Sequence, residues 1–398
     1  MEFKKFKKFK TLPIISLAII LAISSCRTDD YYILSEETEI DTHSDTTRAK
    51  GMYLLCQGNM GSNKCQLDYL AFSSDSGKAG TTAHYFSNIY AERNPDVVKE
   101  LGDVGNDIKI YGSKLWIVVN CSNKVEVCRA SDTRKLTQID IPNCRYLAFH
   151  KGFAYVSTFV GPIKVAGDAP IGKVCKIDTL TMKIVDEVEV GYQPEEMAVI
   201  GDRLYVANSG GYRVPNYDRT VSEIDLNTFR ELRKIDVAPN LYRCQSDKYG
   251  QLWVSSRGDY FGSAPAIHCL APNSQGVLEP SAVIAGNSGG ASSMQIVGDT
   301  LYYTGSDFNF TTMRNEQTIG MIDVRTRQQI ETTLFRAPEI AKIERLYSII
   351  VNPETKDFYL LDAKNYVSSG ELLHFLPDGT FDYKVWTGDI PCAAEFFY

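Results

Sequence analysis

The chain has 398 residues, and its 42 Lys and Arg against 49 Asp and Glu give a formal net charge of −7. This acidic balance argues against nucleic acid or a bare anionic membrane surface as a partner. The 23 Tyr and 29 Gly instead favour a loop-rich recognition protein.

The N-terminus has the pattern of a lipoprotein signal peptide. A lysine-rich start precedes an apolar segment, 12–23, that is short for a membrane span and ends in Ser24, Ser25 and Cys26. We therefore expect residues 1–25 to be a signal peptide and Cys26 to carry a lipid that anchors the chain without spanning the membrane. The alternative is a soluble signal peptide followed by a chance cysteine.

Residues 26–50 are rich in Asp, Glu, Ser and Thr and poor in large apolar side chains. Such a segment cannot bury enough surface to fold alone. We expect an acidic flexible tether here, of the kind that resembles the surface-export signal of Bacteroidota lipoproteins.

A repeated apolar-aromatic segment predicts the fold of residues 51–398. Its aromatic positions recur at steps of 39 to 57 residues. They are Trp116, Tyr155, Tyr205, Trp253, Tyr302 and Tyr359, with an earlier copy at Tyr53. This spacing is typical of four-stranded propeller blades, so we predict an all-β, seven-bladed β-propeller. An irregular β-sandwich is the alternative.

The two ends of this domain carry a further prediction. Residues 395–398 read as a strand, and we expect it to pair beside the strand near Tyr53 and close the ring.

Nine cysteines follow Cys26, an odd number that leaves at least one outside any intrachain pair. Cys128 and Cys175 lie in strand patterns and are expected to be small buried hydrophobic residues. A disulfide between Cys56 and Cys65, or between Cys121 and Cys128, remains open.

Two sets of loops are candidates for the site. The first set opens each blade and brings arginines, tyrosines and carboxylates to the end of the ring axis, where Arg145, Arg243 and Arg345 recur. These arginines either face a ligand or form salt bridges with Asp107, Glu195, Glu196 and Glu344 that join blades. The second set follows the aromatic segments and is rich in Tyr, Phe and Asn, whose rings either bind a partner or pack over the blades.

Catalytic motifs are absent from the sequence. The histidines are scattered, and there is no Gly-x-Ser-x-Gly, phosphate-binding loop, Cys-x-x-Cys or zinc-type Cys/His grouping. We therefore expect neither a protein-bound metal nor a cofactor, and a binding protein rather than an enzyme. A lactonase-type propeller is the remaining enzyme alternative, with Asp107, Glu195 and Glu196 as its candidate acids.

Three segments resemble the YncE-like propellers of Bacteroidota surface lipoproteins. They are residues 53–59, 104–108 and 204–208, the last followed by Ile224-Asp225. With the signal peptide and tether, the chain resembles the BtuG type, cell-surface lipoproteins that bind cobalamin (vitamin B12). The resemblance implies a location on the outer membrane at the cell surface, and delivery of cobalamin to a BtuB-type TonB-dependent transporter.

The resemblance carries no ligand motif, so the candidate site rests on the two loop sets. We expect ligand contacts from Asn106, Arg145, Tyr146, Phe159, Asn208, Tyr212, Tyr242, Arg243, Arg257, Tyr260, Phe308, Arg345, Tyr347 and Tyr366. A surface propeller that binds a glycan or a protein is the alternative function.

Overall fold

The computed structural model describes residues 34–45, 47–72, 81–163, 165, 168–285, 291–309 and 314–398. The expected signal peptide and Cys26 lie outside the described residues. Among those that are described, no helix is both long and apolar enough to cross a membrane.

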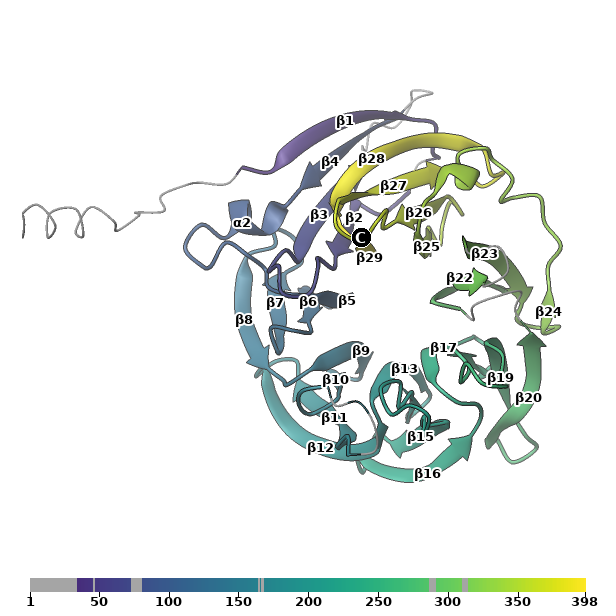
Figure 1. Cartoon of the computed structure of the whole chain (residues 1–398). Coiled ribbons are helices and arrows are strands. Elements are labelled where there is room, and N and C mark those ends of the chain that lie inside the picture. Colours follow the sequence, from purple (N-terminus) through teal and green to yellow (C-terminus); the bar gives the residue numbers. More distant parts are fainter. Residues whose placement is uncertain are drawn as a thin grey trace, which may run out of the picture. The chain divides into compact units, whose positions relative to one another are not determined.

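Seven antiparallel sheets surround a common axis, each with one edge strand at the centre of the ring (Figure 1). The predicted fold, an all-β, seven-bladed propeller with four-stranded blades, is confirmed. Blade 1 is the exception in strand number because a fifth strand joins it, and it is built from both ends of the domain. From the centre outward it contains β29 (Pro391–Phe397), β2 (Gly51–Cys56), β3 (Gln66–Phe72), β4 (Thr81–Ser87) and β1 (Glu36–Thr42).

The other six blades are each continuous in sequence and run from the inner strand outward. Blade 2 contains β5 (Gly105–Tyr111), β6 (Lys114–Val119), β7 (Lys124–Arg129) and β8 (Lys135–Asp140). Blade 3 contains β9 (Cys144–His150), β10 (Phe153–Thr158), β11 (Ile171–Asp178) and β12 (Lys183–Tyr192). Blade 4 contains β13 (Pro194–Ile200), β14 (Arg203–Asn208), β15 (Thr220–Asp225) and β16 (Arg230–Asp236).

Blades 5 to 7 follow the same plan, with a shortened outer strand in blade 6. Blade 5 contains β17 (Leu241–Ser246), β18 (Leu252–Ser256), β19 (Ala266–Pro272) and β20 (Leu278–Ala285). Blade 6 contains β21 (Ser293–Val297), β22 (Thr300–Asn309), β23 (Arg314–Asp323) and β24 (Gln328–Gln329). Blade 7 contains β25 (Leu346–Val351), β26 (Phe358–Asp362), β27 (Ser369–Phe375) and β28 (Phe381–Asp389). Two short helices, α2 (Ile89–Arg93) and η1 (Ile340–Lys342), lie in connections.

The aromatic residues that repeat in the sequence pack between neighbouring blades. Trp116 of blade 2 is buried in a cluster shared with blade 3, and Trp253 of blade 5 in one shared with blade 6. Tyr359 of blade 7 and Tyr53 of blade 1 fill the equivalent positions at the point of closure. The hydrophobic core is therefore divided among the blade interfaces, and the repeat period is the blade period.

The C-terminal strand closes the ring, as predicted. β29 pairs with β2 in antiparallel register, so that Gly51 lies opposite Phe397 and Leu54 opposite Ala394. Closure by strand pairing leaves β2 without a free edge, because it lies between β29 and β3.

Part of the expected tether is a strand, which corrects the sequence-based boundary. β1 pairs with β4 along its length, with Ile40 opposite Ala83, and buries Ile40. At the end of β1, Thr42 donates a hydrogen bond to Asp382 at 2.6 Å, and beyond the strand Arg48 pairs with Glu354. The acidic composition misled the prediction because the open edge of β4 supplies the backbone partners that this segment lacks alone.

The two disulfides that the sequence left open do not form. All nine cysteines in the described part of the chain are free thiols, and eight of them are buried. Cys128 and Cys175 are small buried hydrophobic residues, as predicted.

Candidate ligand-binding rim

The starts of the inner strands and the loops between second and third strands lie together, and we call this surface the rim. Two contacts show that the loop sets meet: the Arg257 guanidinium lies 3.5 Å from the ring centroid of Tyr242, and the Tyr347 and Tyr366 rings are 6.3 Å apart.

A β-bulge recurs at the rim end of the inner strands. The register shifts between the inner and second strands of every blade except blade 6. A bulge breaks the regular alternation of side chains, so neighbouring residues such as Arg145 and Tyr146 both reach the rim. Bulges of this kind often redirect side chains beside functional sites.

A residue with positive φ precedes five of the inner strands. Asn143 and Asn240 adopt this conformation at low cost, whereas Val104 and Ile390 are β-branched and strained there, with φ of 60° and 57°. Gln193 is the fifth. Such strain persists only where the surrounding structure holds it, and it gathers at ligand sites more often than elsewhere.

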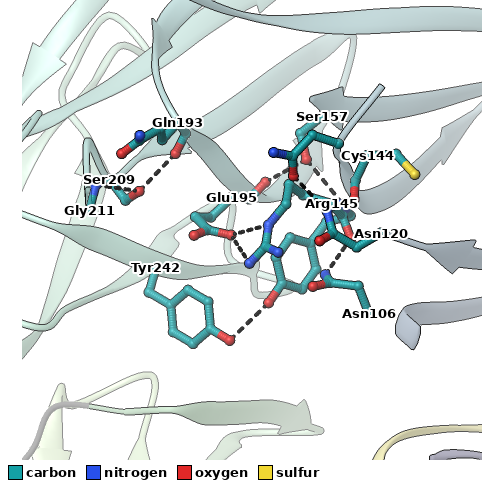
Figure 2. Close-up of polar contacts among 12 residues, drawn as sticks. Asn106, Asn120, Cys144, Arg145, Ser157, Gln193, Glu195, Ser209, Gly211 and Tyr242 are labelled. Carbon is teal, nitrogen blue, oxygen red and sulfur yellow. Dashed lines mark hydrogen bonds and ion pairs between the residues drawn. The ribbon is translucent and has the colours of Figure 1, made fainter. Parts of the chain in front are cut away.

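The first rim cluster is centred on Arg145. Its guanidinium forms a salt bridge with Glu195 of the next blade at 2.9 Å (Figure 2). The same guanidinium lies 4.9 Å from the ring centroid of Phe159. Asn106 donates a hydrogen bond to the Arg145 carbonyl. Burial disfavours the charged guanidinium, but Glu195, with Tyr146 and Tyr242, outweighs this and raises the pKa of Arg145. Arg145 therefore joins blades, as one of the two sequence-based interpretations expected.

Two tyrosines and two more arginines extend this cluster. The Tyr146 hydroxyl donates to the Tyr242 hydroxyl at 3.0 Å (Figure 2). Arg243 lies 4.6 Å from the Tyr242 ring centroid, and its Nε donates to the Ser292 carbonyl at 2.7 Å. Arg257 stacks on the same ring. The cluster thus combines flat rings with guanidinium groups.

The phenols of this cluster differ in acidity. Burial raises the pKa of Tyr146 well above its usual value. Burial also acts to raise the pKa of Tyr242, but the positive charges of Arg243 and Arg257 outweigh it, and the pKa is lowered. The potential around the Tyr242 hydroxyl is therefore positive despite the nearby carboxylate of Glu195.

The second rim cluster comes from blades 7 and 1. The Tyr347 hydroxyl donates to Gln57 at 2.6 Å, and Arg345 lies 5.3 Å from the Tyr366 ring centroid. Burial is the largest cause of the raised pKa of Tyr347, and its electrostatic interaction with Tyr242 is the second. The two clusters therefore interact electrostatically.

One lysine and three carboxylates lie along the inner strands beneath the first cluster. Burial lowers the pKa of Lys109, but Asp107, Glu395 and Glu196 outweigh it and raise that pKa to about 12. Asp107 accepts hydrogen bonds from the backbone of Ile108 and Leu147, and Glu196 from that of Cys244. These carboxylates join neighbouring blades.

Four predicted site residues lie outside both clusters. Asn208 is fully buried and bonds Ser222 and the Gly191 backbone, so it is structural. Tyr212 and Tyr260 lie on rim loops, with 42% and 75% of their surfaces exposed. Phe308 lies in β22, but its side chain falls outside the part of the structure that is described.

Unpartnered polar atoms gather at the rim. The described part of the chain contains six buried side-chain atoms without a hydrogen-bond partner. Four belong to rim positions: Arg213 Nε, Asn240 Oδ1, Thr304 Oγ1 and Arg345 Nε. Unsatisfied buried donors and acceptors are costly, so their concentration on one surface favours a ligand that satisfies them.

Several of these residues were missed by sequence reasoning. Arg213, Asn240 and Gln57 were not among the expected ligand contacts. Asn240 directly precedes the Leu241-Tyr242-Arg243 turn, and Gln57 follows the first aromatic segment. Their position beside predicted rim residues was the available signal.

The acids considered for catalysis are already engaged. Glu195 pairs with Arg145, and Asp107 accepts backbone hydrogen bonds. No group of three or more His, Cys, Asp or Glu within the described ranges is arranged to hold a metal ion. This geometry gives no support to the lactonase alternative.

Comparisons with known proteins show the fold alone. No family model matches the chain. No curated protein matches it either. Among solved structures, a chain of the hydrazine synthase of Kuenenia stuttgartiensis is similar, with a TM-score of 0.55 and 14% identity over 72% of this chain and 87% of that one. A chain of the mitotic checkpoint complex has a TM-score of 0.54 and 10% identity over 73% and 80% of the two chains.

Proposed function

We propose that the protein captures cobalamin on its rim and delivers it to a TonB-dependent outer-membrane transporter. The lipoprotein signal of the sequence supports a lipid anchor at the cell surface. The observation that carries the proposal is the rim itself, where aromatic rings lie beside polar atoms that have no partner in the protein.

The chemistry of cobalamin suits this surface. Its corrin has broad apolar faces and a periphery of amides, and its nucleotide tail carries a phosphodiester. Rings such as Tyr242 and Tyr366 offer flat contacts, and the guanidinium Nε of Arg345 offers a donor for an amide oxygen. The rim residues sit on short inner strands in a closed ring, which lowers the ordering cost of binding. The corrin already holds the cobalt, so no protein metal site is required.

Calorimetric titration of the purified full chain with cyanocobalamin tests this function. We expect one-to-one binding and a higher melting temperature in excess ligand. At a ligand concentration a hundredfold above Kd, binding should add about 2.7 kcal/mol to the free energy of unfolding. Haem serves as a control because it is a flat macrocycle without the amide periphery. An absence of heat and of any thermal shift with cyanocobalamin would reject the proposal.

One observation favours a second candidate function. Tyr260 and Phe261 are adjacent on a loop of blade 5, with 75% and 74% of their surfaces exposed. Exposed neighbouring rings are typical of protein-binding surfaces. An adhesion or accessory role would leave cyanocobalamin unbound and would instead depend on these two rings.

A further inference from the structure

Of the three arginines in the first rim cluster, one forms a salt bridge with a described residue and the other two do not. Arg145 is neutralised by direct contact with Glu195. No carboxylate among the described residues lies within salt-bridge distance of Arg243 or Arg257. Glu196 and Asp107 act on Arg243 electrostatically without touching it. Arg257 therefore carries the least compensated charge of the cluster.

The hydrogen bonds of the cluster leave donors free. Arg243 uses its Nε on the Ser292 carbonyl, and its two terminal nitrogens have no bonded acceptor in the described part of the chain. The Tyr146 hydroxyl donates to the Tyr242 oxygen, so the Tyr242 proton is available to another acceptor. Arg257 lies across the Tyr242 ring, which places its guanidinium beside the same phenol.

We propose that Tyr242, Arg243 and Arg257 form an oxyanion subsite that binds a phosphate or carboxylate group of the ligand. Two guanidinium groups and a hydroxyl are the donor set that recognises such groups by charge-assisted hydrogen bonds. The inference rests on the proposed function for its specific ligand group, the phosphodiester of cobalamin. The positive potential that lowers the pKa of Tyr242 is consistent with it.

The first experiment probes the subsite without cobalamin. The phenolate absorbance of the full chain is titrated with and without inorganic phosphate, and the Tyr242→Phe variant is subtracted to isolate Tyr242. A bound anion opposes the arginine charges, so phosphate should move the Tyr242 titration to higher pH. Acetate in place of phosphate distinguishes a carboxylate from a phosphate preference. A Tyr242 titration that neither anion moves would overturn the subsite.

Variants then assign the effect to the arginines. In Arg257→Gln, the phosphate-dependent shift of Tyr242 should be lost. Arg230→Gln, which removes an exposed arginine from the outer strand β16, should retain it. Equal melting temperatures of the three proteins would show that the variants fold. A phosphate shift that persists in Arg257→Gln and in Arg243→Gln would contradict the assignment.

A ligand pair separates the subsite from the wider function. Dicyanocobinamide lacks the phosphodiester and nucleotide of cobalamin. We expect Arg257→Gln to weaken cyanocobalamin binding by about 10- to 100-fold, the usual effect of one charge-assisted hydrogen bond, and to leave dicyanocobinamide binding unchanged. Equal weakening of both ligands would reject the phosphodiester as the bound group. If cyanocobalamin fails to bind while phosphate still moves Tyr242, the function is wrong and the subsite stands.

Discussion

Two regions of this propeller hold charged side chains that are buried or half-buried, and their charges are compensated differently. In blade 7, His374 lies between Asp382 and Asp357 at 3.1 and 3.4 Å, with the rings of Tyr359 and Tyr383 each 4.6 Å away. We call these five residues the His374 cluster. At the rim, by contrast, Arg243 and Arg257 have no carboxylate in contact among the described residues.

Under the proposed function, the difference separates a structural use of charge from a binding use. The side chain of Asp382 is 1% exposed and accepts hydrogen bonds from Thr42, His43 and His374, so it fastens the N-terminal part of blade 1 to blade 7. The rim instead keeps donors that the protein does not use. Changes in the His374 cluster should therefore alter stability, and changes at the rim should alter binding.

Asp382→Ala should have the largest effect. It leaves the buried His374 with one carboxylate fewer and releases Thr42 and His43, and breaking such a buried pair costs about 3–5 kcal/mol. Denaturant unfolding should show this loss. Asp378→Ala, on the exposed turn that precedes β28, is the matched control. Stability equal to that of the control would remove the distinction between the two regions.

Arg345→Gln should produce the opposite pattern. Its Nε is buried without a partner, so its loss should leave stability unchanged, whereas cobalamin binding should weaken by about 1.5–3 kcal/mol if the ligand accepts from this donor. Calorimetry and thermal melting measure the two quantities on one sample. A variant that melts early and binds normally would show that Arg345 belongs with the structural charges.

The pH dependence of stability sharpens the same comparison. Burial acts to lower the pKa of His374, but Asp357 and Asp382 outweigh it, so the pKa is raised above 6.5. The stabilisation that protonated His374 provides is then fully present below about pH 6.5. It is lost as pH rises through the folded-state pKa of His374, at no more than about 1.4 kcal/mol per pH unit. Melting temperatures measured upward from neutral pH should decline, and Asp382→Asn should flatten that decline.

Tyr260→Ala should have the smallest effect. The side chain is largely exposed, so the melting temperature should not change, and cobalamin binding should weaken by about 1 kcal/mol if the ring contacts the ligand. Unchanged cobalamin affinity, together with lost binding to a protein partner, would assign Tyr260 to the second candidate function.

The fold was predictable because blade packing requires the same residue type at the same place. Trp116 and Trp253 occupy equivalent blade interfaces, so their spacing carries the architecture. β1 was not predictable in this way. Its only buried residues are Ile40 and Thr42, and its pairing depends on β4, which follows 39 residues later in the chain.

The sequence predicts which residues lie at the rim, and it does not predict which side chains they contact there. Equivalent turns place Arg145, Tyr242 and Arg345 on one rim because each begins an inner strand or directly precedes it. Whether such an arginine is neutralised depends on a side chain from the next blade, as Glu195 is for Arg145, and sequence spacing does not contain that information. Asn208 was misjudged for the same reason, since its partners Ser222 and Gly191 come from other strands.

The pairing of β29 with β2 also sets the order in which the protein completes its fold. A chain that emerges amino end first presents β2, β3 and β4 long before residues 391–397 arrive, so the inner edge of β2 stays unpaired through the formation of six other blades. An open edge is a template for pairing with another chain. We therefore expect closure to come last, because of where the two strands lie in the sequence, and to be the step at which folding competes most directly with aggregation.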